Sequence, residues 1–270
     1  MMKTCVIPFN IKWAEKEENI LSAAHELSQV DTDTDVVVLP ELFTTGFIPS
    51  RGTAESLAED NDGKTVRTLK RWAQFFGFAI AGSFLATNGK GYFYNRAFFI
   101  EPHGDATYYD KRHLFPLSKE NRTYTPGSTL SPIVHFRGWN IKLIVCFDLR
   151  FPVWCRNEPG KLFDIMLVPS NWPHSREFQY KTLLSARAIE NQIFTVGANC
   201  TGEDKFGTYP PGQSGIYDNL GVAVHETRKN GHLYAIMNRQ TLIEGRNRFP
   251  AYEAADVYTI DLTKRPEFSR

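Results

Sequence analysis

The sequence predicts a layered α/β fold. Short apolar runs rich in β-branched residues recur along the chain, and longer amphipathic stretches separate them. The length of 270 residues is enough to bury one large core. No repeat, low-complexity tract or Pro/Ser-rich linker divides the sequence. We therefore expect one domain over residues 1–270, with strands inside and helices outside.

Eight segments have the length and composition of buried core strands, since each holds four or five mostly apolar residues. They are Thr4–Ile7, Val36–Leu39, Phe78–Ala81, Arg96–Ile100, Ala106–Tyr109, Ile141–Val145, Ile165–Val168 and Ile193–Gly197. Three later segments lie closer together and indicate hairpins. They are Gly215–Tyr217, Val222–Val224 and Leu233–Met237. The Gly- and Pro-containing run 207–212 predicts a loop.

Three stretches have apolar residues at helical spacing, and we expect them to cover both faces of the strands. They are Glu15–Gln29, Gly63–Phe76 and Arg176–Gln192. Near the end of the chain, Val257–Ile260 is strand-like. We expect the segment of about 252–270 to pack on a partner subunit.

The composition excludes several classes of function. The net charge of +1 gives no electrostatic basis for binding nucleic acid or an acidic membrane. No apolar run reaches the roughly 20 residues of a membrane span, and the N-terminus lacks a secretory pattern, so we expect a cytoplasmic protein. The four cysteines show no C-x-x-C pair, which argues against a zinc site or a disulfide framework.

Three polar residues follow directly after predicted strands. Glu41 comes after the run ending at Pro40, Lys111 after the strand ending near Tyr109, and Cys146 after Ile141–Val145. In α/β sheets, catalytic groups usually lie in loops just past the strand ends. Attack on an amide needs a nucleophile, a proton acceptor and a group that stabilises the oxyanion. A thiol, a carboxylate and an ammonium meet these needs.

Each of the three residues also has a simpler interpretation in isolation. Cys146 could be a small buried apolar residue, Glu41 a carboxylate at a helix start, and Lys111 part of a solvated basic turn. A Cys/His dyad is the second possibility, with His113 as its best candidate because it follows Lys111 by two residues.

The segments around the three residues resemble the signatures of the nitrilase, or carbon–nitrogen hydrolase, superfamily, in the family's order. They are Leu39–Phe47, Tyr109–Phe115 and Ile144–Pro152. The segments Glu120–Gly127, Val168–Pro173 and Ala186–Asn191 are also similar to the family, so the resemblance covers nearly the whole chain.

The resemblance implies a four-layer αββα sandwich. It also implies Cys146 as nucleophile, Glu41 as general base and Lys111 as the oxyanion-stabilising group, with a donor at the Phe147 backbone N–H. Glu120 matches a carboxylate that positions the lysine. Neither a metal nor an organic cofactor is implied, and the protein is expected to form a homodimer or a higher homo-oligomer.

Within the superfamily, residues 41–47, 150–157 and 245–250 are similar to the branch of ω-amidases. Hydrolysis of a small 2-oxo acid monoamide such as 2-oxoglutaramate or 2-oxosuccinamate is therefore the expected reaction. Three aromatic residues beside the signatures are expected to line the pocket: Phe43, Phe115 and Trp172. Arg150 and Arg187 lie near the motifs, but ion pairs with Asp148 and Glu190 are the simpler interpretation of both.

Two other functions stay open. The same chemistry could act on another C–N bond, in a carbamoyl amine, a deaminated peptide amide or a nitrile. A catalytically silent member of the fold could instead bind a metabolite or a partner. A Rossmann-type nucleotide-binding protein is disfavoured, because no G-x-G-x-x-G motif or P-loop occurs in the sequence.

Overall fold

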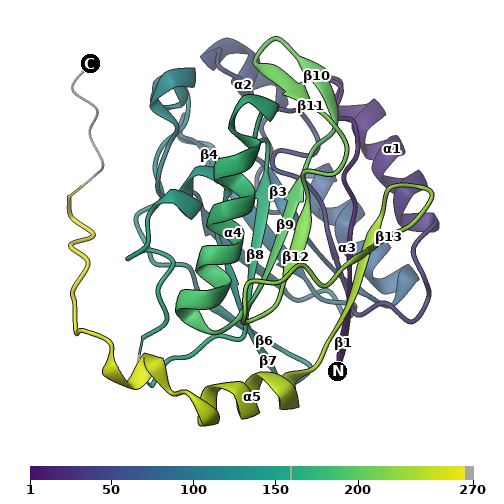
Figure 1. The fold of residues 1–270 in the computed structure, drawn as a ribbon. Coiled ribbons are helices and arrows are strands. Elements are labelled where there is room, and N and C mark those ends of the chain that lie inside the picture. The colour runs from purple at the N-terminus through teal and green to yellow at the C-terminus, as the bar shows by residue number, and fades with distance from the viewer. Residues whose placement is uncertain (159, 265–270) are drawn as a thin grey trace.

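Two β-sheets packed face to face form the centre of the computed structural model, which describes residues 1–158 and 160–264 (Figure 1). The larger sheet has seven strands in the order β13-β14-β1-β2-β3-β4-β5. In chain order these are β1 (Met2–Val6), β2 (Val36–Val38), β3 (Ala79–Thr87), β4 (Phe93–Ile100), β5 (Ala106–Asp110), β13 (Glu226–Thr227) and β14 (Leu233–Met237). Only β1, β2 and β3 pair in parallel in this sheet.

The smaller sheet has five strands in the order β12-β9-β8-β7-β6. Its strands are β6 (Ile133–Phe136), β7 (Trp139–Leu143), β8 (Ile165–Ser170), β9 (Phe194–Asn199) and β12 (Gly215–Tyr217). The three central strands β7, β8 and β9 are parallel. A separate hairpin consists of β10 (Gly202–Asp204) and β11 (Gly207–Tyr209).

Strand residues alternate between two buried layers, as the two-residue period of a strand requires. On β2, Val36 and Val38 belong to the apolar cluster between the sheets, whereas Val37 belongs to the cluster under the helices. The pair Ala79 and Ile80 on β3 divides in the same way. Both faces of the central strands are therefore buried, which explains their continuous apolar sequence.

Helices form the two outer layers. The larger sheet is covered by α1 (Lys16–Ser28) and α3 (Lys64–Phe76), and the smaller by α4 (Glu177–Asn191), on the opposite side of the strands in Figure 1. These three helices match the predicted ones to within one residue at each end. The four-layer αββα sandwich implied by the resemblance is thus confirmed.

Two helices were not predicted. The helix α2 (Arg51–Leu57) is only seven residues long, and α5 (Arg239–Arg248) has no apolar stripe. Polar contacts hold α5 instead, because Arg246 donates to Asp164 Oδ1 at 2.8 Å and to the Phe163 carbonyl at 2.7 Å. Sequence periodicity does not detect a helix that is fixed by one buried arginine.

Some segments differ from their predictions. The run 207–212 begins with strand β11 rather than a loop, because the Asp204 side chain accepts from the N–H groups of Phe206 and Gly207 and closes a hairpin turn. In 222–224 only Ala223 forms a bridge, to Tyr217. The strands β6, β10 and β13, which have two to four residues each and lie at sheet edges, were not predicted.

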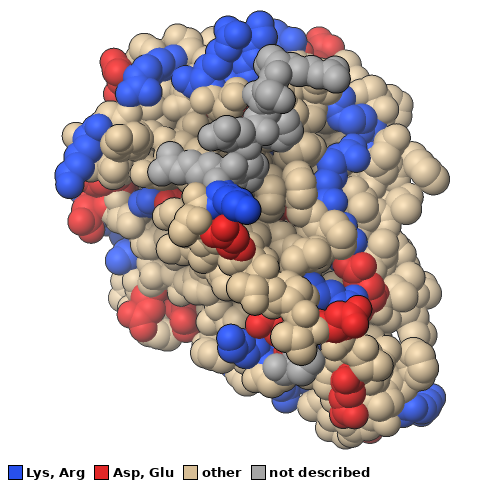
Figure 2. Space-filling view, turned by 90° about the vertical axis from the view of Figure 1, so that its left-hand side faces the viewer, with Lys and Arg blue, Asp and Glu red and all other residues tan. Residues whose placement is uncertain are grey.

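The predicted strand at 257–260 is wrong, since residues 255–260 form no regular element. The segment instead lies along its own chain, where the Tyr258 hydroxyl donates to the Val153 carbonyl at 3.3 Å and Ile260 and Leu262 pack against the core. Basic side chains gather along the upper edge of this face, and basic and acidic ones are mixed below them (Figure 2). The expected contact with a partner remains a prediction, and residues 265–270 lie outside the described part.

Candidate active site

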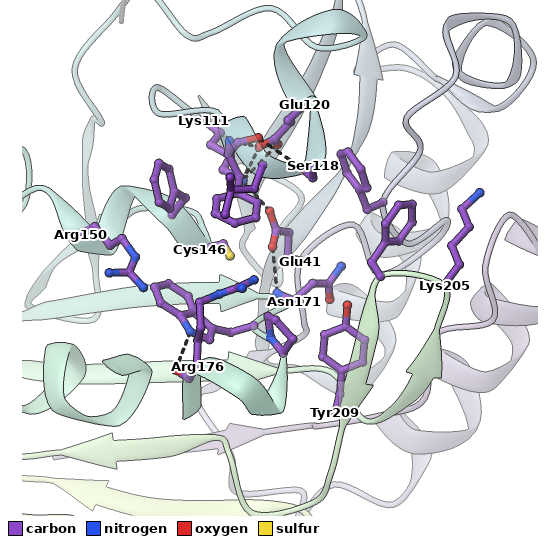
Figure 3. Close-up of a pocket in the computed structure, with 17 residues that line it drawn as sticks. Glu41, Lys111, Ser118, Glu120, Cys146, Arg150, Asn171, Arg176, Lys205 and Tyr209 are labelled. Carbon is purple, nitrogen blue, oxygen red and sulfur yellow. Dashed lines mark hydrogen bonds and ion pairs between the residues drawn. The ribbon is translucent and has the colours of Figure 1, made fainter. Parts of the chain in front are cut away.

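Loops after strands of the two sheets bring Glu41, Lys111 and Cys146 to one cavity (Figure 3). Glu41 follows β2 and Lys111 follows β5, both in the larger sheet, whereas Cys146 follows β7 in the smaller one. The structure therefore places the three residues singled out by the sequence together, although 105 positions separate the first from the last.

Cys146 has a backbone φ of +45°, a conformation that L-residues rarely adopt. It is the first residue of the short helix η3 (Cys146–Arg150), so the chain turns sharply between strand and helix. Such a conformation costs about 1–3 kcal/mol and persists only where the surroundings fix it. Cys146 is half-buried and lines the cavity, whereas Cys5, Cys155 and Cys200 are buried.

The Asp148 carboxylate, which does not line the cavity, fixes this turn through hydrogen bonds. Its Oδ2 accepts from the Tyr109 hydroxyl at 2.7 Å and from the Val145 N–H at 3.2 Å. Its Oδ1 accepts from the His113 backbone N–H at 2.9 Å and lies 2.8 Å from His113 Nδ1. The residue thereby joins the loop that carries Lys111 to the loop that carries Cys146.

Lys111 is buried between two carboxylates. Its Nζ lies 2.9 Å from Glu41 Oε1 and 3.0 Å from both oxygens of Glu120. Burial by itself lowers the pKa of the ammonium, but the charges of Glu120 and Glu41 outweigh it and hold that pKa well above its usual value. The side chain is therefore a fixed positive charge at the cavity wall.

Three donors define the position of the Glu41 carboxylate. Its Oε1 accepts from Lys111 and from Asn95 Nδ2 at 2.7 Å, and its Oε2 accepts from the Asn171 backbone N–H at 2.8 Å. Asn95 is itself oriented by Ser83, whose hydroxyl donates to Asn95 Oδ1 at 2.9 Å. Sequence reasoning missed Asn95, although a polar residue at a buried position of an apolar strand was a usable signal.

The thiol of Cys146 stays protonated at neutral pH. Burial raises its pKa well above the usual value, the Glu41 charge adds to this, and Lys111 and the Asn171 backbone N–H oppose it. Glu41 and Cys146 line the same cavity. A proton acceptor thus lies directly beside the only thiol, among the described residues, that lines the cavity.

The cavity has a volume of about 360 Å³ and combines aromatic and charged walls. Phe115 and Trp172 line it as expected, together with Phe47, Phe147 and Tyr209. The prediction for Phe43 is wrong, because its ring is fully buried and packs edge-on against Phe98 at 5.9 Å. Phe43 lies in a turn where Leu42 has a φ of +48°, and its backbone N–H donates to the Ser83 carbonyl of β3 at 3.0 Å.

Three further cations line the cavity: Arg150, Arg176 and Lys205. The expected ion pair between Arg150 and Asp148 is absent among the described residues, and the Arg150 guanidinium instead lies 5.0 Å from the centre of the Trp172 ring. The expected pair between Arg187 and Glu190 is confirmed at 2.9 Å. Arg176 and Lys205 were not predicted to belong to the site.

His113 does not line the cavity. Its ring stacks on Phe151 with centres 3.7 Å apart, and its Nδ1 faces Asp148. The arrangement does not favour the alternative Cys/His dyad. Within residues 1–158 and 160–264, no group of His, Cys, Asp and Glu side chains has the geometry to hold a metal ion. In the same residues, no helix is both long and apolar enough to cross a membrane.

The carbon–nitrogen hydrolase family model matches residues 4–247, and this chain belongs to that family. It is accordingly a hydrolase that acts on carbon–nitrogen bonds. The chain is 36% identical to the omega-amidase YafV of Escherichia coli K12, over 96% of this chain and 98% of the relative. It is 32% identical to the 2-oxoglutaramate amidase of Bacillus subtilis, over 92% and 95% of the two chains.

Solved structures agree with this assignment. The CN-hydrolase superfamily protein XC1258 of Xanthomonas campestris, solved with an arsenic adduct in its active site, superposes with a TM-score of 0.88 at 35% identity and covers 96% of this chain and 99% of its own. Yeast Nit3, a nitrilase superfamily member, has a TM-score of 0.81 at 21% identity, over 92% and 94% of the two chains. The latter likeness concerns the fold alone.

Proposed function

We propose that this protein is an ω-amidase that hydrolyses the terminal carboxamide of a small 2-oxo acid monoamide to a carboxylate and ammonia. The observation that carries the proposal is that Glu41, Lys111 and Cys146 line one cavity, with Glu41 Oε1 2.9 Å from Lys111 Nζ. The names of the relatives from Escherichia coli and Bacillus subtilis support the substrate class.

In the proposed first half-reaction, Glu41 takes the proton of the Cys146 thiol as the sulfur attacks the amide carbon. The raised pKa of the thiol makes this transfer necessary, because little thiolate exists before the substrate binds. The carbonyl oxygen becomes an oxyanion and accepts from Lys111 Nζ and the Phe147 backbone N–H. The C–N bond then breaks, Glu41 returns its proton to the departing nitrogen, and ammonia leaves a thioester on Cys146.

In the second half-reaction, Glu41 takes a proton from a water molecule, which attacks the thioester carbon. A second oxyanion forms at the same donors, the C–S bond breaks, and the sulfur regains a proton from Glu41. One carboxyl group thus acts as base and acid in turn. Glu120 holds the Lys111 ammonium in place and does not exchange protons with the substrate.

The test is ammonia release by the purified protein from 2-oxoglutaramate and 2-oxosuccinamate. Glutamine, asparagine, a carbamoyl amine and a nitrile are measured beside them. We expect the two oxo acid amides to be cleaved with a kcat/KM at least ~100-fold above the other compounds. Cleavage of only one of the other compounds would support the catalytic site but contradict the substrate class. Inertness toward all of the compounds would favour a catalytically silent metabolite-binding protein.

The cytoplasmic location and the homodimer belong to the same proposal. All four cysteines are free thiols, which suits a reducing compartment.

An exposed apolar patch on the α4 side consists of Ile189, Leu220 and Val222, which are 52%, 71% and 56% exposed. Their proximity follows from Gly221, where an added Cβ would come within 2.6 Å of Ile189. Light scattering should give the mass of a dimer, and Ile189→Glu should lower it.

A further inference from the structure

Among the charged residues that line the cavity, the cations outnumber the anions. Glu41 and Glu120 are both paired with Lys111, whereas Arg150, Arg176 and Lys205 have no hydrogen bond or ion pair from their charged groups to any described residue. Three unpaired cations beside a neutral thiol make the cavity attractive to an anionic ligand.

The three cations differ in where their charge lies. Lys205 is in the turn of the β10–β11 hairpin, where its Nζ lies 3.6 Å from the centre of the Trp13 ring, and Figure 3 shows it on the far side of the cavity from Cys146. Arg150 lies over Trp172, on the other side of the view. Arg176 lies between them, below Cys146 and close to Asn171 in the same view.

The guanidinium of Arg176 packs directly on the catalytic loop. Its Cζ is 5.0 Å from the centre of the Phe115 ring. The backbone N–H of Phe115 donates to Glu120 Oε2 at 2.5 Å, and its ring contacts Phe147 with centres 5.1 Å apart. Phe115 therefore contacts Arg176, the Glu120 carboxylate that binds Lys111, and Phe147, the residue after the nucleophile.

The backbone of Arg176 is fixed while its guanidinium edges stay available. Its N–H donates to the Pro173 carbonyl at 2.9 Å, and its carbonyl accepts from Trp172 Nε1 at 2.8 Å. The guanidinium lies over the Phe115 ring and makes no hydrogen bond or ion pair with the described residues, so its N–H groups remain for a ligand. This is the geometry in which arginine binds a carboxylate through two parallel hydrogen bonds.

We propose that Arg176 binds the substrate carboxylate that lies at the opposite end from the reacting amide, and that this contact confines efficient hydrolysis to carboxylate-bearing amides. The inference rests on the proposed amidase function, which it deepens by naming the receptor. Arg176 is a binding residue here. It determines which amides reach Cys146 and takes no part in proton transfer.

The test uses two readouts that separate the receptor from the reaction. In a Cys146→Ala background, titration with 2-oxoglutarate, the expected product, measures binding of the carboxylate without turnover. Arg176→Met should weaken this binding by about 10- to 100-fold, the range expected for a lost charge-assisted contact. Lys205→Met, which removes a cation from the far side of the same cavity, should change it by less than about 3-fold.

With Cys146 present, Arg176→Met should lower kcat/KM for 2-oxosuccinamate by a similar factor, mainly through KM. Turnover of butyramide, a neutral amide of the same chain length, should stay within about 2-fold. Unchanged binding of 2-oxoglutarate by Arg176→Met, or a loss that appears in Arg150→Met alone, overturns the assignment. If binding of 2-oxoglutarate depends on Arg176 but no oxo acid amide is hydrolysed, the proposed function is rejected. The assignment of Arg176 as the carboxylate-binding residue then still stands.

Discussion

Asn95 Nδ2 lies 2.7 Å from Glu41 Oε1, the same oxygen that lies 2.9 Å from Lys111 Nζ. The asparagine cannot rotate its amide without losing the hydrogen bond from Ser83, whose hydroxyl also accepts from the Leu42 backbone N–H at 2.8 Å. The Glu41 carboxylate is therefore held in one orientation by neighbours on β3 and β4. We assign Asn95 a positioning role for the general base.

Replacing Asn95 by leucine should lower kcat by about 10- to 100-fold, because a hydrogen bond to a charged carboxylate is lost while the side-chain volume is kept. KM should change by less than about 3-fold, since Asn95 does not line the cavity. Ser83→Ala, which removes the hydroxyl that orients Asn95 and accepts from the Leu42 N–H, should give a smaller loss. A rise in KM with unchanged kcat would contradict the positioning role.

Glu120→Gln should leave a folded enzyme with kcat reduced by about 10-fold, whereas Lys111→Met should reduce it by about 10²–10³-fold. The glutamine still accepts one hydrogen bond from Lys111, but the methionine removes the charge that faces the oxyanion. Steady-state kinetics on the same oxo acid amide would test the order. A larger loss for Glu120→Gln than for Lys111→Met would mean that Glu120 has the chemical role.

Asp148→Asn should destabilise the protein by about 3–5 kcal/mol, because an amide cannot accept from all four donors that the carboxylate satisfies. Urea unfolding measures this change in the free energy of unfolding. The exposed Asp105→Asn is the matched control and should change it by less than 0.5 kcal/mol. Equal stability of the two variants would show that the buried network does not hold the turn at Cys146.

Alkaline pH should destabilise the fold through its buried thiols. Burial raises the pKa of Cys155 to about 12, above its value near 9 in the unfolded chain, so the folded state keeps the proton longer. The resulting stabilisation is complete below pH 9 and is lost as the pH rises from 9 to 12. For Cys155→Ala, the decline in unfolding free energy with pH should be shallower by about 1.4 kcal/mol per pH unit in this range. Equal slopes for the parent protein and Cys155→Ala would contradict a raised pKa of Cys155 in the folded state.

The core strands and three long helices were predictable because their apolar patterns are strong and continuous, whereas the four-layer arrangement followed from the family resemblance. The elements missed were α2, α5 and short strands such as β6 and β10, which are held by few residues or by polar contacts. Arg246 illustrates the point, since a buried arginine fixes α5 where no apolar stripe exists. Pattern reading detects burial of apolar surface and misses helices attached through single ion pairs.

The candidate site was predictable where a residue lies inside a recognisable segment. Glu41, Lys111, Glu120 and Cys146 are such residues. Arg176 lies far from them in sequence and reaches the cavity only because Trp172 and Pro173 fix its backbone beside Phe115. Phe43 failed for a different reason, because residues 41–45 form a turn in which Leu42 has a φ of +48°, and the Phe43 ring packs against Phe98 in the core. Contacts of these kinds are tertiary and leave no local pattern.

The most direct test of the account compares two cysteines nine positions apart. Cys146 is partly exposed in the cavity, whereas Cys155 is buried and its thiol lies 3.4 Å from the Asp148 carbonyl. Ammonia release from 2-oxosuccinamate should be abolished in Cys146→Ala and should stay within about 2-fold of the parent in Cys155→Ala. Substantial release by folded Cys146→Ala would contradict the covalent mechanism and the central role of this thiol.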